Sequence, residues 1–497
     1  MTADAKKAII IGSGFGGIAA ALRLRAKGYS VKVIDRSPML GGRAQVLTKN
    51  GFKHDAGPTV ITAPFLLDEL FALFQEKLED HIKLVPLKPW YRFYFSDQTT
   101  FDYGGSLEET LTEIEKVEPK DKAGYLKLLN HSKNIFDIAF TQLSARPFHR
   151  FFLMVSLIPK LIVLKSYETV WTTVSRHLIS PKLRQAFSIQ PLLVGGNPFS
   201  TTSIYGLIHY LERAYGVFFA MGGTGAIVDA LRKLMERQNI EICLNTTVRN
   251  IIVNNKKASG VMLEDGTKIT ADIIVSNADA AYLYQNMIDD HQVAVSSKLK
   301  VKLAHYSMGL FVVYFGTTKQ YPDVVHHTIW LGKTYKELLS NIFAKKILSD
   351  DFSLYIHRPT ATDKSFAPAG CDSFYVLCPV PNLKANIDWS IEGETLKNKI
   401  VEALDKTLLP DLQKHITDDF FMTPNDFKTQ YLSMHGAGFS IAPLFRQSAW
   451  FRFHNKAEGI KNLYITGAGT HPGAGLPGVL CSAKVIDQLI PLATDFK

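Results

Sequence analysis

The sequence predicts an α/β fold of more than one domain, and three observations carry that prediction. A glycine-rich turn lies between short apolar segments near the N-terminus, a mostly helical block follows, and strand-like segments return in the second half. A chain of 497 residues also exceeds one ordinary core, so several segments are expected to share two or more domains.

The first element is a strand–helix–strand unit. Residues 8–11 are uncharged and apolar, which is typical of a buried parallel strand, and residues 12–17 are rich in glycine. A helix is expected over 18–27, with Gly28 at its C-terminal end, and a second strand over 30–34. This order predicts a βαβ unit.

The glycine turn carries a recognisable pattern. Gly12-Ser13-Gly14-Phe15-Gly16-Gly17 matches G-x-G-x-x-G, with the strand before it and the helix after it that this pattern requires. In a Rossmann-like unit Gly12 allows the tight turn, Gly14 lets the backbone approach a pyrophosphate, and Gly17 permits close helix–strand packing. Asp35 ends the second strand, where a carboxylate accepts hydrogen bonds from a ribose. The sequence therefore predicts a Rossmann-like dinucleotide-binding domain.

Two short segments after Asp35 extend this site. Gly41-Gly42-Arg43 places a guanidinium in a glycine-opened loop, where it could contact a pyrophosphate in a bidentate manner or be a surface charge. Residues 55–59 combine small side chains with a rigid Pro58. Backbone of this kind can lie flat against a planar ring, although a plain turn has the same composition.

The C-terminal region adds a second glycine-rich segment. A strand is expected over 462–466, followed by residues 467–478, which contain five glycines and include His471. A helix starting near Val479 could point its positive end at a reduced, anionic flavin, although a simple glycine-rich loop is the alternative. His435 and His471 both stand in glycine-rich segments and could approach the same ring.

Between these ends the pattern changes twice. Residues 64–215 look mostly helical, with helical apolar spacing over 66–74 and 125–140. Strand signals then return, and a Gly turn after residue 263 predicts a hairpin. The expected strands are 216–221, 259–263, 268–270, 309–315 and 373–377, the last two in a mixed sheet.

Charge and cysteine content narrow the possible partners. A net charge of +10 suits nucleic acid, an anionic membrane surface or a basic soluble protein, but no run of five basic residues occurs, so nucleic acid is not expected. The four cysteines lack zinc-site spacing, which favours free thiols. His326 and His327 should point opposite ways on a strand, and no carboxylate ligand pattern accompanies them, so no metal is expected.

Hydropathy gives the expectation for membranes. Glycines interrupt the uncharged stretch 8–22, which argues against a secretory signal, and no apolar stretch reaches the ~18 residues needed to span a bilayer. Residues 148–165 are apolar, broken by Pro159 and edged by Arg146, Arg150, Lys160 and Lys165. We hypothesise a monotopic element that dips into a membrane surface, with a buried cap helix as the alternative.

The sequence resembles the bacterial phytoene desaturase family, which comprises FAD-dependent carotene desaturases of the amine-oxidase-like flavoprotein group. The resemblance runs nearly end to end, and residues 192–199 and 471–478 are its most particular segments. Asp35 stands where such proteins usually have Glu, which keeps the carboxylate. The other matching segments are 12–17, 41–44, 52, 55–62, 222–226, 447–452 and 467–470.

The resemblance implies a fold and a cofactor. It implies a discontinuous Rossmann-like FAD-binding domain formed by residues 1–63, 216–300 and 455–497, a helical cap over 64–215, and a mixed-sheet substrate domain over 301–454. The implied FAD-binding residues are Gly12, Ser13, Gly14, Phe15, Gly16, Gly17, Asp35, Arg36, Gly42, Arg43, Gly57, Pro58, Thr59, Val248, Gly469, Leu476, Pro477, Gly478 and Val479.

The implied activity is stepwise dehydrogenation of phytoene by hydride transfer to flavin, forming lycopene. The substrate would be a long apolar polyene taken up at the cytoplasmic face of a membrane, with oxygen or a quinone as electron acceptor. No catalytic residue is identified. A carotenoid 3,4-desaturase or a carotenoid isomerase is the alternative on the same fold. A prenyl-chain escort protein is the non-enzyme alternative, and the intact glycine turn, Arg43 and Gly469 argue against it.

Overall fold

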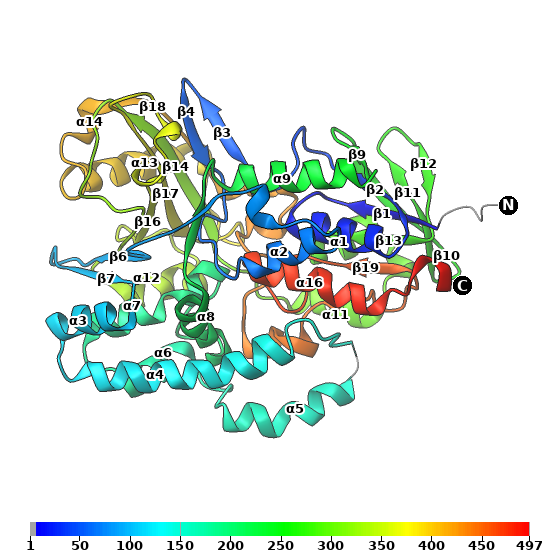
Figure 1. Ribbon diagram of the computed structural model, residues 1–497, viewed down its shortest axis with the longest axis horizontal. Coiled ribbons are helices and arrows are strands. Elements are labelled where there is room, and N and C mark those ends of the chain that lie inside the picture. The colour runs from blue at the N-terminus through cyan, green and yellow to red at the C-terminus, as the bar shows by residue number, and fades with distance from the viewer. Residues whose placement is uncertain (1–5, 150, 497) are drawn as a thin grey trace.

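The protein is described here by a computed structural model, which covers residues 6–149 and 151–496. Two large sheets and a layer of helices make up the fold (Figure 1). The first sheet has five parallel strands in the order β19-β13-β1-β2-β9. These strands are β1 (Lys7–Ile11), β2 (Ser30–Ile34), β9 (Glu241–Cys243), β13 (Ile273–Ser276) and β19 (Leu463–Ile465).

The predicted βαβ unit is confirmed. β1 pairs with β2 in parallel, and α1 (Phe15–Ala26) connects them. The helix begins inside the glycine turn, three residues before the expected start, with Gly14 as its N-cap. α1 is buried along most of its length because it packs beside α16 (Leu476–Leu489) and α9 (Thr224–Arg237). Segments from both chain ends thus share one core.

The second sheet has seven strands in the order β18-β14-β17-β16-β15-β6-β7. Strands β6 and β7 come from the block that the sequence analysis read as mostly helical. They are only four residues long and rich in aromatic side chains, and β6 joins the sheet by a parallel pairing with β15. The strands are β6 (Tyr91–Tyr94), β7 (Thr100–Tyr103), β14 (Gly309–Thr317), β15 (His327–Trp330), β16 (Leu354–His357), β17 (Asp372–Val380) and β18 (Ile416–Met422).

Smaller sheets complete the β structure. The predicted hairpin is confirmed as β11 (Lys257–Leu263) and β12 (Lys268–Thr270), joined by β10 (Val248–Asn254) in a three-stranded sheet. Two pairs were not predicted as such: β3 (Val46–Lys49) with β4 (Phe52–Asp55), and β5 (Leu84–Pro86) with β8 (Phe218–Ala220).

Helices cover one end of the sheets, and α5 lies at the outer edge of the molecule in Figure 1. α4 passes into a π-helical turn, Asp137–Gln142, before the chain reaches α5. Among the described residues, no helix is both long and apolar enough to cross a membrane. The helices of this layer are α3 (Leu107–Val117), α4 (Asp121–Phe136), α5 (Phe151–Val163), α6 (Val170–His177), α7 (Pro181–Ser188) and α8 (Leu207–Tyr215). α2 (Phe65–Ala72) packs instead beside α1 and α16.

The remaining helices pack around the sheets. α13 is the longest and covers one face of the seven-stranded sheet, where Trp389 and Leu396 join the core formed by β14 and β17. Their bounds are α10 (Ala280–Tyr282), α11 (Val295–Leu303), α12 (Tyr335–Ser340), α13 (Trp389–Asp405), α14 (Leu412–His415) and α15 (Pro424–Tyr431).

Candidate active site

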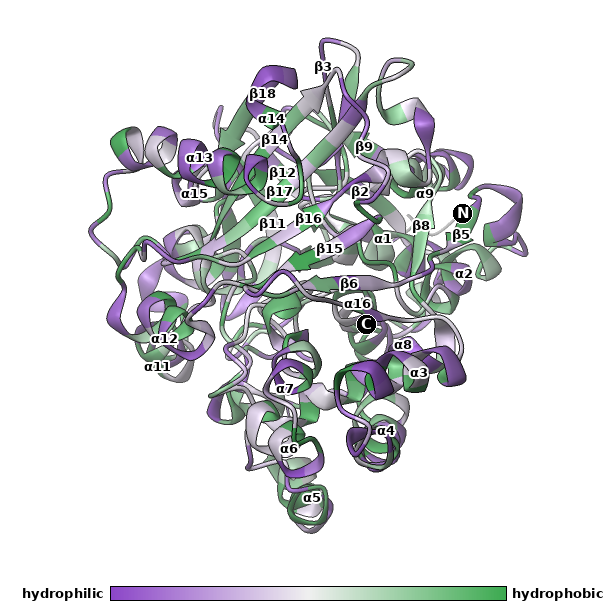
Figure 2. Cartoon of the chain, turned by 90° about the vertical axis from the view of Figure 1, so that its left-hand side faces the viewer, coloured by the Kyte–Doolittle hydropathy of each residue, from purple (hydrophilic) through white to green (hydrophobic). Residues whose placement is uncertain are grey.

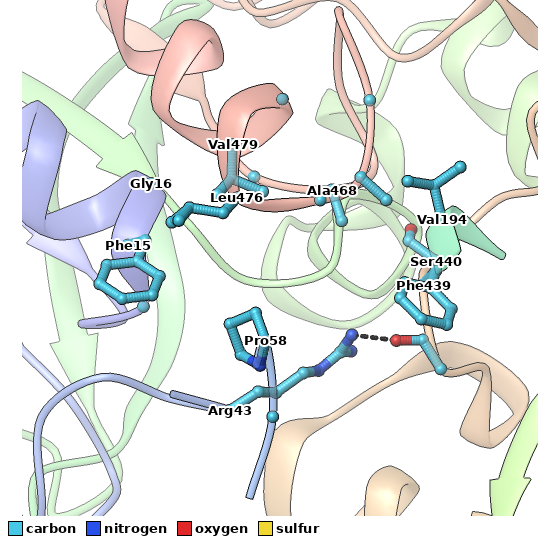
Figure 3. Close-up of a pocket in the computed structure, with 18 of the residues that line it drawn as sticks. Phe15, Gly16, Arg43, Pro58, Val194, Phe439, Ser440, Ala468, Leu476 and Val479 are labelled. Carbon is cyan, nitrogen blue, oxygen red and sulfur yellow. Dashed lines mark hydrogen bonds between the residues drawn. The ribbon is translucent and has the colours of Figure 1, made fainter. Parts of the chain in front are cut away.

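A cavity of about 990 Å³ runs between the parallel sheet, the seven-stranded sheet and the helical layer. Of the nineteen residues predicted to bind the cofactor, every one except Gly17 lines this cavity. They come from segments more than 400 positions apart in the chain. Figure 3 shows Phe15, Arg43, Pro58, Leu476 and Val479 around the same space.

The glycine turn has a backbone that larger residues would disrupt. Gly12 has φ +91°, in the left-handed region. A Cβ on Gly14 would lie 2.8 Å from the Asn277 side-chain nitrogen, and one on Gly17 would lie 2.0 Å from the Gly12 carbonyl oxygen. The absence of a side chain at Gly17 therefore allows α1 to pack against the turn. The approach of a ligand to the N-terminal end of α1 at the other glycines stays a prediction.

Asp35 is held at the end of β2. Its Oδ2 accepts hydrogen bonds from the Ser13 amide and hydroxyl, both at 2.6 Å, and its Oδ1 accepts one from the Ser37 amide at 2.8 Å. This arrangement ties the glycine turn to the second strand and leaves lone pairs for a ribose diol. The neighbouring Arg36 lines the cavity and donates to the Thr429 carbonyl at 3.0 Å.

Arg43 is engaged by the protein itself. Its guanidinium donates to the Gly438 carbonyl and to the Ser433 hydroxyl, and it lies 6.0 Å from the Phe427 ring centre and 5.9 Å from that of Tyr431. Burial lowers the pKa of Arg43, and the nearby Asp279 raises it. Only some of its five N–H donors are used, so a pyrophosphate contact stays a prediction.

The backbone at Gly57 and in the C-terminal glycine segment is closely packed against neighbouring residues. A Cβ on Gly57 would lie 2.8 Å from the Arg43 carbonyl oxygen, and one on Gly469 would lie 2.9 Å from the Ser440 hydroxyl. α16 begins at Leu476, three residues earlier than expected, so its N-terminal turn carries Leu476, Pro477 and Gly478 along the cavity. The positive end of this helix thus faces the space between the two glycine segments.

The two glycine-segment histidines differ in position. His471 lines the cavity, its Nε2 lies 2.9 Å from the Leu143 carbonyl oxygen, and burial lowers its pKa to about 4. His435 is not among the residues that line the cavity, and its ring packs 4.8 Å from that of Tyr306. Among the rest of the predicted set, Val248 lines the cavity at the start of β10.

Several lining residues were missed. Asn277 and Asp279 follow β13, which was not predicted as a strand, and Asp279 caps α10 by accepting from the Ala281 and Tyr282 amides. The apolar run over Ile273–Ser276, directly before Asn-Ala-Asp, was an available signal. Residues 438–440 gave no local signal, because only the fold brings them beside Arg43.

The other half of the cavity is apolar. Its walls come mainly from helices α5 and α8 and from strands of the seven-stranded sheet. Glu212 also lines it; its Oε1 accepts from the Tyr91 hydroxyl at 2.8 Å, while its buried Oε2 has no partner among the described residues. Burial raises the pKa of Glu212 to about 8, so the carboxyl is mainly neutral at pH 7. The apolar lining includes Met154, Leu157, Leu161, Leu207, Ile208, Leu211, Ile329 and Leu331.

The adjacent histidines do not lie as expected. His326 precedes β15 and His327 is its first residue, so strand alternation does not apply to the pair. Their rings are 4.6 Å apart, and the His357 ring of β16 lies 4.8 Å from that of His326.

The fold and the glycine-lined cavity define a flavoprotein oxidoreductase. Residues 15–485 match the family of flavin containing amine oxidoreductases, and the chain belongs to that family. Cyclohexylamine oxidase from Brevibacterium oxydans has the same fold, with a TM-score of 0.62 at 14% identity, covering 99% of each chain.

Within that family the chain is a bacterial-type phytoene desaturase. It is 42% identical to the lycopene-forming phytoene desaturase of Pantoea ananas, covering 98% of this chain and 99% of the relative. It is 40% identical to the neurosporene-forming enzyme of Rhodobacter capsulatus, covering 98% and 94%. The predicted fold class, enzyme class and family are confirmed, and FAD is the cofactor. We call the glycine-lined part of the cavity, which includes residues 12–16, Asp35, residues 57–59 and residues 476–479, the FAD cradle. Its backbone is closely packed, since added Cβ atoms at Gly14 and Gly57 would collide with neighbours, and it fits that ligand.

Proposed function

We propose that this enzyme dehydrogenates phytoene stepwise and forms lycopene. The observation that carries the proposal is the continuity of the cavity, which joins the FAD cradle to an apolar chamber. Relatives that form lycopene or neurosporene are similarly distant, at 42% and 40% identity, so the number of steps is a matter for measurement. The prenyl-escort alternative is set aside because the relatives are enzymes and FAD is the cofactor.

The chain's own residues have a limited chemical task in this reaction. Bound FAD supplies a hydride acceptor. The apolar walls would hold an extended polyene and exclude water, so that successive carbon atoms can be positioned for reaction. Such a substrate offers nothing for hydrogen bonding, which agrees with walls built from Leu157, Leu207 and Ile329.

The test is a product analysis with purified protein, FAD and liposomes that contain phytoene. Parallel reactions receive oxygen, or a quinone without oxygen, and products are separated by chromatography. We expect lycopene with at least one acceptor. No desaturated product in either reaction would refute phytoene as substrate. A 3,4-desaturated product from supplied lycopene, or isomerised carotene with no change in hydrogen content, would favour the alternatives.

We further propose that α5 docks this enzyme on a membrane surface from which the polyene enters. Exposed apolar side chains cover its outer side; Phe152 is 84% exposed and Val163 79%. Figure 2 shows α5 as a largely hydrophobic helix at the extremity of the molecule. The same helix lines the cavity with Met154, Leu157 and Leu161. The buried cap helix considered as the alternative does not agree with these exposures.

Basic residues flank this helix. Lys160, Lys165 and Arg146 are exposed, as an anionic lipid surface would require. Arg150, the fourth flanking residue of the sequence hypothesis, lies outside the described residues.

Liposome flotation tests the docking. We expect the combined Phe152→Ser, Val155→Ser and Val163→Ser variant to bind anionic vesicles at least 100-fold more weakly, since each lost contact costs about 1 kcal/mol or more. The matched control carries Ile347→Ser and Ile391→Ser, which remove two exposed apolar side chains outside α5, 52% and 64% exposed. Equal lipid binding by all three proteins would refute the proposal.

A further inference from the structure

Three buried histidines converge at one end of the paired strands β15 and β16, inside the seven-stranded sheet and outside the lining of the cavity. His326, His327 and His357 are 5%, 0% and 0% exposed. One ring nitrogen can be chosen from each so that the three atoms lie within 4.8 Å of one another. Two of the histidines stand at the start of β15 and the third ends β16, so paired strands fix their spacing.

Each ring is oriented by an oxygen atom on one side only. His326 Nδ1 lies 2.7 Å from the Thr362 hydroxyl, His327 Nδ1 lies 2.7 Å from the Tyr355 hydroxyl, and His357 Nε2 lies 3.1 Å from the Asp55 carboxylate. The second nitrogen of every ring, His326 Nε2, His327 Nε2 and His357 Nδ1, is buried and has no partner in the described structure.

This pattern is the one that metal-binding histidines show. A ligating imidazole offers one nitrogen to the metal while the other bonds to a carboxylate or another oxygen, which fixes the ring. Buried polar atoms without partners cost free energy, and here three of them belong to rings whose centres lie 4.6, 4.8 and 5.4 Å apart.

We propose that His326, His327 and His357 bind one divalent transition-metal ion of the zinc class. Imidazole nitrogens in a tetrahedral zinc site lie about 3.4 Å apart, so from the present limit of 4.8 Å each ring closes by at most about 1 Å. Arg358, which directly follows His357, is paired with Asp372, whose Oδ2 lies 2.9 Å from its Nε. The Asp55 carboxylate behind His357 contributes the negative charge that such a site favours.

The position gives the ion a structural role. Asp55 Oδ1 also accepts from the Thr224 amide and hydroxyl at the start of α9, at 2.8 and 2.9 Å. The Tyr355 hydroxyl lies 2.6 Å from that of Thr59, which lines the FAD cradle. A metal at the three rings would therefore fix β15 and β16 to the segment between Asp55 and Thr59.

Metal analysis of the flavin-loaded enzyme tests the proposal. The protein is prepared without a histidine tag, loaded with Zn²⁺ and dialysed, and its metal is counted by mass spectrometry. We expect about one ion per chain, and Co²⁺ loading should give the visible absorption of a tetrahedral imidazole site in a difference spectrum against the metal-free holoenzyme.

Variants assign the ion to these residues. We expect His326→Gln and His327→Gln to lose at least nine-tenths of the bound metal, while His54→Gln keeps it. His54 is a matched control because it is buried, 1% exposed, and also has one unpartnered nitrogen, but it lies outside the cluster. If the cluster variants do not fold, a chelator-competition titration of the unaltered enzyme measures whether one Zn²⁺ ion is bound per chain.

Two results would overturn the proposal. One is an enzyme that takes up no Zn²⁺ or Co²⁺ after loading, which would leave a buried water as the partner of the three rings. The other is full metal content in both cluster variants. Loss of desaturase activity alone bears on neither result, because the readout is bound metal.

Discussion

Replacing Gly17 by alanine tests whether close packing at the glycine turn holds the FAD cradle together. The added Cβ would lie 2.0 Å from the Gly12 carbonyl oxygen and 3.2 Å from the Asn277 Cβ. Relief to an ordinary contact needs a shift of more than 1 Å between α1 and the turn. Overpacking of this kind costs about 1–3 kcal/mol, and alanine regains up to about 1 kcal/mol of helix propensity.

A net loss of about 2 kcal/mol at the cradle predicts FAD binding roughly 30-fold weaker. The assay is a titration of flavin-free protein with FAD, read by flavin fluorescence, together with a thermal unfolding curve. Gly206→Ala is the matched control, because its added Cβ would meet nothing within 4 Å and its φ is −62°. Wild-type affinity and stability in Gly17→Ala would refute the packing argument.

Three further predictions concern buried or cradle carboxylates. Asp35→Asn should weaken FAD binding about tenfold, since hydrogen bonds to a charged acceptor are worth about 1.5–3 kcal/mol, whereas Asp35→Glu should retain the affinity; the same titration decides. Asp372→Asn should lower the free energy of unfolding by about 3 kcal/mol by leaving Arg358 buried without its charge partner, measured against the exposed Asp411→Asn. Glu212 has a folded-state pKa raised by burial from 4.5 to about 8, so its stabilising effect is full below pH 4.5 and is lost as pH rises through 8. The thermal midpoint of the wild type should therefore fall relative to Glu212→Gln over that window, and parallel curves would contradict this.

Local pattern was enough to predict the first part of the site. Residues 8–35 form a strand, a glycine turn, a helix and a strand in that order. Nearby residues determine each of these features, namely the apolar strand residues, the positive φ at Gly12 and the acid after β2. The roles of Gly17 and Gly14 follow from the same geometry. The C-terminal glycine segment was predicted for a similar reason, because closely spaced glycines let the backbone adopt positive φ and approach a flat ligand.

Pairings between distant segments could not be predicted in this way. β6 and β7 are four-residue strands that exist because β15 offers an edge more than 200 positions away. Arg43 was expected to contact phosphate, yet its partners Ser433 and Gly438 come from a loop that only the folded chain brings near. The alternation rule failed at His326 because the strand starts one residue later.

The cavity has two chemically different ends because two kinds of element build it. Loops that follow β1, β2, β13 and β19 meet at one edge of the parallel sheet and supply the amides, glycines and Asp35 that a dinucleotide needs. Helices and the face of the second sheet supply the apolar end, which extends to α5.

This division explains the unusual surface of α5. A helix at a protein surface ordinarily has one apolar stripe, directed at the core. In α5, Met154 and Leu157 face the cavity while Phe152 and Val163 face outward, so apolar side chains cover both sides. A second apolar side at the surface is costly in water and stabilising against lipid. Under the proposed docking, α5 alone would separate the lipid from the cavity, and a helix that is apolar on both sides suits the passage of the proposed polyene, which is why we place the proposed entry route at α5.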